Sequence, residues 1–211
     1  EIPGSLVGSE MCIRDRTGIL SIPLTTMKIV NFFFLISLFF TFNSLSDETT
    51  SWELLKEGGK VVFIRHAYAP GGGDPKNFDL YDCSTQRNLN EEGINQSKIM
   101  GKLFSEYSIP IDSVYSSQWC RCEDTARLAF GNFENLSALN STFSANYQKN
   151  HSKQMSDLYQ FIKNWDNSQG NLIFITHYVI VGGFLDYYPS SGEIVITDKS
   201  LSVLGSIKIN F

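Results

Sequence analysis

Two of the three histidines in this chain of 211 residues follow directly on apolar stretches. "VVFIRH" ends at His66 and "NLIFITH" ends at His177, whereas His151 lacks that context. In open α/β sheets, ligands bind outside the carboxyl ends of the strands, and two imidazoles placed there can face each other across a crevice. A single histidine at a strand end is more often structural. Two in the same context, one of them preceded by Arg65, favour a functional site.

Arg121 extends this pattern toward anion binding. In "VYSSQWCRCEDTARLAF", a predicted strand ends at Tyr115, Ser117 is expected to cap the next helix, and Arg121 falls near its first turn. Side chains there lean back toward the helix N-terminus, where free N–H groups and the helix dipole favour an anion. A guanidinium at this point offers planar, bidentate geometry for phosphate oxygens. The structural alternative is a pairing of Arg121 with an acid such as Glu123 or Asp124.

Taken together, Arg65-His66, "YSSQWCRCEDTA" and "FITH" resemble the sequence blocks of the histidine phosphatase superfamily, also called phosphoglycerate mutase-like. "RNLNEEGINQSK" is similar to the start of a helix in the same family, and the four blocks occur in family order. The resemblance implies that His66 is the nucleophile that accepts a phosphoryl group. It also implies that Arg65, Arg121 and His177 form the phosphate pocket.

The chemistry of these residue types agrees with what the resemblance implies. A neutral imidazole nitrogen can attack phosphorus, which splits phosphoryl transfer into formation and hydrolysis of a phosphohistidine. Fixed positive groups around the equatorial oxygens stabilise the charge of the transition state, so no metal or other cofactor is expected. Arg87 matches an arginine near the pocket of small relatives, with a plain surface ion pair as the alternative. The expected partner is a small phosphorylated substrate.

One group of the family pattern is missing. Many members supply a glutamate after the helix that carries the second arginine, and this glutamate protonates the leaving group. Here "ALNSTF" occupies that place and has no carboxylate. Asp74 in the glycine-rich "GGGDP", Asp82 and Glu193 are candidates, but turn formation by the two aspartates and a strand start at Glu193 also explain them. No general acid is therefore assigned.

The predicted function is an exported, metal-independent phosphohydrolase. The alternative is a non-catalytic binder of phosphorylated sugars or envelope polymers that retains the phosphate pocket, and the missing glutamate is its main support. A metallohydrolase that uses both histidines is a weaker alternative, because no cluster of ligands joins them. A phosphoglycerate mutase is disfavoured because the chain lacks the long insertions and the acid block of that activity.

Apolar stretches and helical periodicities alternate along the chain and predict its elements. Strands are expected at residues 60–64, 111–115 and 171–176, helices from about 90 to 107, after 117 and from about 153 to 165, and a hairpin at 192–211 that turns at Asp198-Lys199. Buried strands separated by helices predict a three-layer α/β/α sandwich with a largely parallel central sheet.

The N-terminus has a different character from the rest of the chain. Residues 1–26 show neither helical nor strand periodicity and resemble a translated sequencing adaptor, so a non-native extension is expected there, with a natural disordered extension as the alternative. Residues 27–46 have a basic start, an apolar core and small residues before the expected cleavage site, which predicts a signal peptide, with a retained anchor as the alternative. Residues 47–211 are then one histidine phosphatase domain, periplasmic or secreted.

The net charge bears on the kinds of binding partner, and the cysteines bear on disulfide formation. The formal net charge of −5 indicates no nucleic-acid or anionic-membrane binding, and after signal cleavage no membrane contact is expected. Three cysteines lie in the predicted domain, and either one disulfide from Cys83 to Cys120 or Cys122, or three reduced thiols, agrees with the pattern. The oligomeric state is left open.

Overall fold

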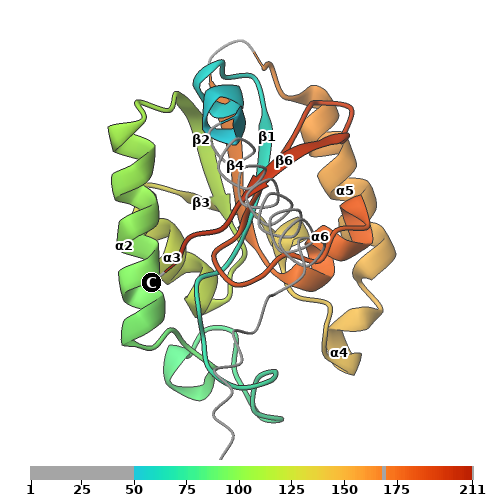
Figure 1. Cartoon of the computed structure of the whole chain (residues 1–211). Helices are drawn as coiled ribbons and strands as arrows, with labels where there is room; N and C mark the ends of the chain where they lie inside the picture. The colour runs from blue at the N-terminus through green and yellow to red at the C-terminus, as the bar shows by residue number, and fades with distance from the viewer. Residues whose placement is uncertain (1–49, 168–169, 211) are drawn as a thin grey trace, which may run out of the picture. The chain divides into compact units, whose positions relative to one another are not determined.

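A computed structural model describes residues 50–167 and 170–210, which contain a six-stranded sheet with the order β3-β2-β4-β1-β5-β6 (Figure 1). The predicted extension at 1–26 and the predicted signal peptide at 27–46 lie outside the described residues. Within these ranges, every helix is too short or too polar to span a lipid bilayer. The strands are β1 (Val61–Arg65), β2 (Ile111–Ser116), β3 (Glu134–Asn135), β4 (Asn171–Thr176), β5 (Ile194–Thr197) and β6 (Val203–Ile207).

The sheet is largely parallel, as predicted. β1 runs parallel to β4, β4 to β2, and β2 to β3. Within the described strands, β5 runs antiparallel to both β1 and β6. β5 and β6 form the predicted C-terminal hairpin, and the N–H of Asp198 donates to the carbonyl of Ser202 in its turn.

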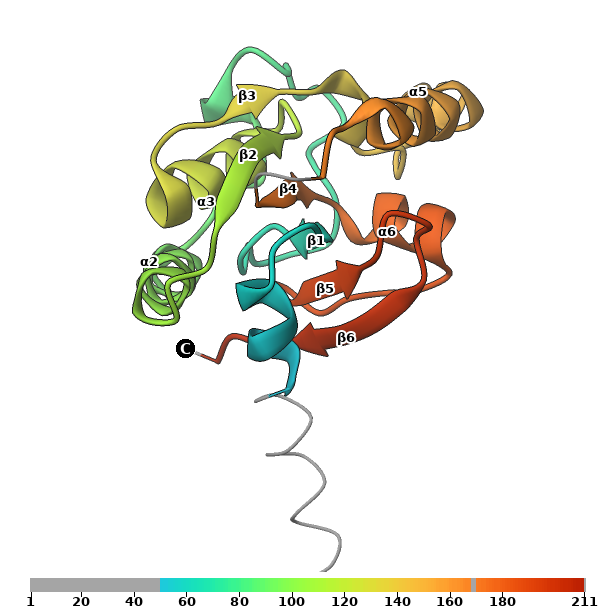
Figure 2. The ribbon, with the colours of Figure 1, turned by 90° about the horizontal axis from the view of Figure 1, so that it is seen from above.

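Helices cover both faces of this sheet, with α2 and α3 on one side and α5 and α6 on the other (Figure 2). Val62 and Ile64 of β1 pack in the core beneath α2 and α3, whereas Val61 and Phe63 pack beneath α5 and α6. Because both faces are buried, the central strands are almost entirely apolar. The predicted three-layer sandwich is therefore confirmed. The helices are α2 (Glu91–Glu106), α3 (Cys120–Phe130), α4 (Ala145–Gln148), α5 (His151–Asn164) and α6 (Tyr178–Leu185), and residues 50–56 are also helical.

The two helices that follow β1 and β2 begin in different ways. Asn90 caps α2 as predicted, because its side chain accepts a hydrogen bond from the Gly93 N–H at 3.1 Å. The predicted cap of α3 at Ser117 is wrong: Trp119 occupies the N-cap position and makes no side-chain capping bond. The Ser117 hydroxyl instead contacts His177, so a tertiary partner replaces the local one.

Cys83 and Cys120 form a disulfide, and Cys122 is a free, buried thiol. This decides between the alternatives that the sequence left open. The bond joins a 3-10 helix (Cys83–Thr85) in the long β1–α2 connection to the first residue of α3. It therefore ties that connection to the helix turn that carries Arg121.

Loss of this disulfide is expected to destabilise the domain. Cys83→Ser opens a loop whose ends are 37 residues apart, and chain entropy predicts a loss of about 4 kcal/mol in the free energy of unfolding. Urea unfolding followed by tryptophan fluorescence checks this. Dithiothreitol should lower the wild-type midpoint to that of the variant and leave the variant unchanged. A wild-type midpoint that stays the same with and without dithiothreitol would contradict the expectation.

Candidate active site

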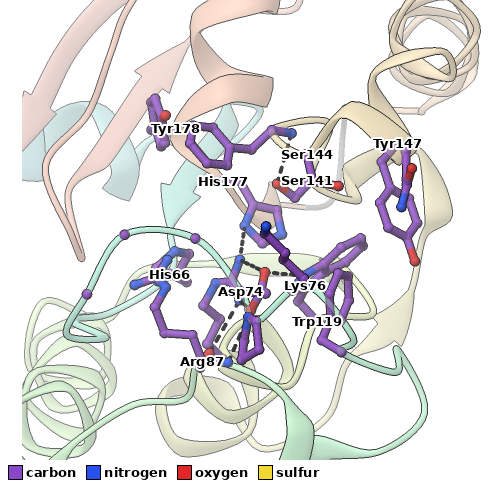
Figure 3. A pocket seen from close by; sticks show the side chains of 18 of the residues that line it. His66, Asp74, Lys76, Arg87, Trp119, Ser141, Ser144, Tyr147, His177 and Tyr178 are labelled. Carbon is purple, nitrogen blue, oxygen red and sulfur yellow. Dashed lines mark hydrogen bonds and ion pairs between the residues drawn. The ribbon is translucent and has the colours of Figure 1, made fainter.

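A cavity of about 600 Å³ lies at the carboxyl ends of β1 and β4 (Figure 3). His66 directly follows β1 and His177 directly follows β4, and their ring centres are 5.5 Å apart. The His66 N–H donates to the Thr176 carbonyl at 2.9 Å, which extends the strand pairing to the site. The cavity wall brings together all five residues predicted for the site: Arg65, His66, Arg87, Arg121 and His177.

His66 is buried, and its hydrogen bond defines its tautomer. Nδ1 lies 2.8 Å from the carbonyl oxygen of Ala67. A carbonyl can only accept, so Nδ1 carries the proton and Nε2 keeps its lone pair. Burial, and then the positive charge of Arg121, lower the pKa of His66 well below its ordinary value of 6.5. The imidazole is therefore neutral at pH 7, with Nε2 in the nucleophilic state.

A threonine of α3 holds the chain immediately after His66. The Ala67 N–H donates to Thr125 Oγ1 at 3.0 Å, and this hydroxyl donates to the Arg121 carbonyl at 2.7 Å. One side chain thus links the backbone of the predicted nucleophile to the helix turn that carries the predicted phosphate ligand. The threonine of the "CEDTA" block positions the site without lining it.

The "EEGINQS" segment of α2 holds the next residue of the same loop. The Tyr68 N–H donates to Gln96 Oε1 at 2.9 Å, and Gln96 Nε2 donates to the Ser191 and Ile209 carbonyls. A Cβ at Gly93 would lie 2.0 Å from the Tyr68 carbonyl oxygen, so only glycine allows this close approach. The start of α2, which resembles the family pattern, therefore holds the loop after His66 in place.

His177 is also buried but has the opposite tautomer. Its Nδ1 lies 3.5 Å from Nη2 of Arg121, which can only donate, and its Nε2 lies 2.9 Å from Ser117 Oγ. Nε2 therefore carries the proton and donates it to Ser117, whose hydroxyl lies 3.2 Å from Asn140 Oδ1. Burial, and then the charge of Arg121, lower the pKa of His177 well below its ordinary value.

Arg121 is 3% exposed and forms a bidentate ion pair with Asp74 of the glycine-rich loop. Nη1 lies 2.7 Å from Oδ1 and Nη2 lies 3.2 Å from Oδ2. The acids predicted as alternative partners, Glu123 and Asp124, bond to other side chains. The Nε atom of Arg121 is buried and has no partner in the described part of the chain.

The other two arginines are half-buried: Arg65 is the last residue of β1, and Arg87 lies in the connection before α2. Arg65 donates to the Pro189 carbonyl at 3.0 Å and lies 5.2 Å from the ring centre of Tyr178. Arg87 donates to the Ala69 carbonyl. Neither pairs with an acidic side chain within residues 50–167 and 170–210, so Arg87 does not form the surface ion pair named as its alternative. Both guanidinium groups are available to an anion.

The three candidate acids have different surroundings. Asp74 lines the cavity, and it is the only carboxylate in the cavity wall among the described residues. Asp82 is exposed and caps the short 3-10 helix, in line with its turn-forming alternative. Glu193 is buried and accepts hydrogen bonds from the Tyr187 hydroxyl at 2.6 Å and the Ser190 N–H at 2.7 Å. Asp82 and Glu193 are therefore structural.

Trp119, Tyr147 and Ser141 line the cavity although the sequence did not assign them to the site, whereas Phe78 was a candidate for the substrate entrance. Phe78, Trp119 and Tyr147 form one aromatic side of it, with ring centres 5.2 to 5.8 Å apart. Ser141 comes from "ALNSTF", the segment without the expected carboxylate. Most of these residues lie in irregular segments, where no periodicity marks them. His151, at the start of α5, contacts Thr142 and lies outside the cavity wall.

Cys122 adds no second nucleophile to the site. Its Sγ lies 3.5 Å from His177 Nε2, and burial raises the pKa of the thiol to about 12. The group is therefore a thiol rather than a reactive thiolate at neutral pH. In the described parts of the chain, no three His, Cys, Asp or Glu side chains gather into a group that would hold a metal ion.

Both buried histidines are expected to stay neutral as the pH falls through 6.5, because their pKa values lie well below that ordinary value. NMR of histidine-labelled protein checks this, with His66 in the Nδ1–H form and His177 in the Nε2–H form. Spectra of His66→Asn and His177→Asn assign the signals. The unfolded chain binds protons that the folded chain excludes, so the free energy of unfolding should also fall below pH 6.5. A titration midpoint at or above 6.5 for either ring would disprove the assignment.

Comparisons with known proteins agree with this architecture. Residues 61–171 match the family model of the histidine phosphatase superfamily (branch 1). The solved structure of open reading frame Rv3214 from Mycobacterium tuberculosis has a TM-score of 0.52 and 14% identity, covering 72% of this chain and 97% of that one. TTHB049 from Thermus thermophilus has a TM-score of 0.50 and 16% identity, covering 70% and 98%. At these identities, the likeness concerns the fold alone. No curated protein matches the chain.

The family match spans more than half of the chain and includes the strand before His66, the predicted nucleophile itself, and the helix turn with Arg121. The fold around these residues has the central sheet, the covering helices and the cavity at the strand ends described above. The chain therefore belongs to the histidine phosphatase superfamily (branch 1), a superfamily of phosphatase- and mutase-type enzymes.

Proposed function

We propose that the chain hydrolyses phosphate monoesters or related phosphorylated compounds through a phosphohistidine formed on His66. The observation that carries the proposal is the hydrogen bond from His66 Nδ1 to the Ala67 carbonyl, which leaves Nε2 unprotonated. The same residue lines a cavity with three arginines. A neutral imidazole nitrogen is a nucleophile for phosphorus, and fixed guanidinium groups stabilise charge that develops on the phosphoryl oxygens.

The proposed reaction has two displacements at phosphorus. In the first, Nε2 of His66 forms a bond to phosphorus while the bond to the leaving oxygen breaks. In the second, water attacks the phosphohistidine, the N–P bond breaks, and Nε2 regains its lone pair. Arg65, Arg87 and Arg121 hold the phosphoryl oxygens in both steps. A bound phosphate dianion also favours protonation of His177 Nδ1, which then becomes a further donor.

The surroundings of the cavity favour substrates with good leaving groups. Asp74 is the only carboxylate in its wall within the described residues, and the ion pair with Arg121 keeps it ionised. An ionised carboxylate cannot protonate a leaving oxygen. Phosphohistidine, pyrophosphate and aryl phosphates need less protonation than alkyl phosphates, and these classes are therefore the preferred substrates.

Hydrolysis of p-nitrophenyl phosphate in the presence of EDTA tests the proposal. The wild-type chain should release p-nitrophenol, and His66→Ala should lose at least about a thousandfold in turnover, because the nucleophile is absent. His151→Ala is the matched control, since the third histidine lies outside the cavity wall and should keep wild-type activity. Circular dichroism confirms that each variant is folded. Near-wild-type turnover in His66→Ala would refute the nucleophile, and inhibition by EDTA would favour a metallohydrolase.

A non-catalytic binder of phosphorylated sugars or envelope polymers is the second candidate function. The observation that favours it is the ion pair of Asp74 with Arg121, which occupies part of the phosphate pocket. A phosphoprotein that is labile in acid, stable in base and absent from His66→Asn separates the two functions. Its formation from a labelled phosphate ester supports the enzyme, and ester binding without it supports the binder.

We also propose that the protein is exported, with residues 27–46 as its signal peptide. The disulfide between Cys83 and Cys120 supports this, because disulfides form and persist in oxidising compartments such as the periplasm. N-terminal sequencing of the protein recovered from a periplasmic fraction checks the proposal. A mature chain that begins near residue 47 is the expected result, and recovery of the uncleaved chain from the cytoplasm would contradict it.

A further inference from the structure

We infer that Asp74 is a built-in competitor of phosphate in the proposed phosphate pocket. Its carboxylate pairs with the guanidinium of Arg121, which the incoming phosphoryl group also needs. This competition weakens the binding of phosphate. The inference rests on the proposed function in one respect, that the ligand of this pocket is a phosphoryl group. It adds a residue that sets the affinity of the pocket and the release of the product.

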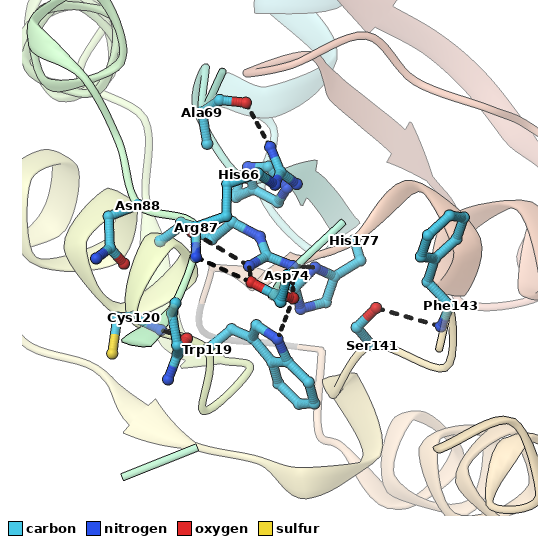
Figure 4. A network of polar contacts seen from close by, with 12 residues as sticks. His66, Ala69, Asp74, Arg87, Asn88, Trp119, Cys120, Ser141, Phe143 and His177 are labelled. Atoms are coloured by element: carbon cyan, nitrogen blue, oxygen red, sulfur yellow. Dashed lines mark hydrogen bonds and ion pairs between the residues drawn. The ribbon is translucent and has the colours of Figure 1, made fainter. Parts of the chain in front are cut away.

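The carboxylate of Asp74 is held as a phosphate would be held (Figure 4). Oδ1 accepts from Arg121 Nη1 at 2.7 Å and from the Arg87 N–H at 3.1 Å. Oδ2 accepts from Arg121 Nη2 at 3.2 Å and from Trp119 Nε1 at 3.0 Å. Each oxygen thus has two donors, and one pair of donors is the guanidinium fork that binds phosphate in a bidentate way.

While Asp74 stays in place, both terminal nitrogens of Arg121 already have hydrogen-bond partners. Besides the two bonds to Asp74, its Nη1 donates to the Arg87 carbonyl at 3.3 Å and its Nη2 lies 3.5 Å from His177 Nδ1. A phosphoryl group gains both terminal nitrogens only if Asp74 leaves. A phosphoryl group bound at Nε instead meets the negative charge of Asp74 across the same guanidinium. Both arrangements oppose binding of the anion.

The positive charge of the cavity suggests what this competition does for the release of phosphate. Four basic side chains, Arg65, Arg87, Arg121 and Lys76, line the cavity with two neutral histidines, and Asp74 is the only carboxylate in its wall within the described residues. Burial acts to raise the pKa of Asp74, but the hydrogen bonds and charge of Arg121 outweigh it and lower the pKa, so the group is ionised at neutral pH. Three uncompensated guanidinium groups would retain inorganic phosphate after hydrolysis, and Asp74 returns to displace it.

Three successive glycines precede Asp74 in its loop. Gly71 and Gly73 have φ angles of 95° and 85°, values that residues with a Cβ rarely adopt. A Cβ at Gly72, between them, would meet no atom within 4 Å. Release of Asp74 from Arg121 requires the side chain or this backbone to turn, and the three glycines have no side chains that such a turn would have to repack.

Calorimetric titration with inorganic phosphate tests the inference. Asp74→Asn should bind phosphate about tenfold more tightly than the wild-type chain, which corresponds to about 1.4 kcal/mol. Asp124→Asn is the matched control: it makes the same charge change on a partly exposed residue of α3 that pairs with Arg127 outside the cavity wall, and its affinity should equal that of the wild type. Equal or weaker binding in Asp74→Asn would overturn the inference and make Asp74 a positioning residue for Arg121.

A second variant keeps the test decisive if Asp74→Asn does not fold. Trp119→Phe keeps an aromatic ring at this position and the charge of Asp74 but removes the Nε1 donor, so it weakens the hold on the carboxylate and should also tighten phosphate binding. Unchanged or weaker binding there would count against the competition. Because binding is measured rather than turnover, the two proposals fail separately. Tighter binding in a protein that never hydrolyses esters refutes only the enzyme, and turnover with unchanged affinity refutes only the role of Asp74.

Discussion

The parallel pairing of β1 with β4 is the constraint on which the rest of the site depends. The two strands are in register from Val61 opposite Leu172 to Arg65 opposite Thr176, and the His66 N–H extends the ladder by one more bond. A slip of one residue would turn every side chain to the opposite face, and both faces here are buried in apolar cores. This register therefore brings the two strand-end histidines beside each other.

Burial at the strand ends also determines the ionisation of the site. The desolvation that follows from the packed sheet lowers the pKa values of His66 and His177 and keeps both imidazoles neutral beside three arginines. Their hydrogen bonds give the two imidazoles different tautomers: Nε2 is unprotonated on His66 and protonated on His177. Asp74 offsets part of the positive charge. The pocket thus combines a nucleophile, fixed donors and a carboxylate that limits its affinity.

Much of the fold was predictable because its signals are local. β4 was predicted with the bounds that it has, and Asn90 caps α2 as its position before the helix indicates. The wrong cap at Ser117 shows where local signals end, because its hydroxyl bonds to His177, 60 residues away. The disulfide partner of Cys83 could not be predicted from the sequence either. Cys120 and Cys122 lie on one helix turn, and only the three-dimensional structure shows that Cys120 faces Cys83.

The sequence by itself determined the two strand-end histidines, the arginines of the pocket and the resemblance to the family, because each lies within a short block next to a buried strand or a helix start. Only the tertiary structure decided which nitrogen of each imidazole is free and what Asp74 does. Asp74 reaches Arg121 across 47 residues, from a loop without periodicity. Its partner is set by how the β1–α2 connection packs against α3, and such non-local contacts leave no pattern in the order of the residues.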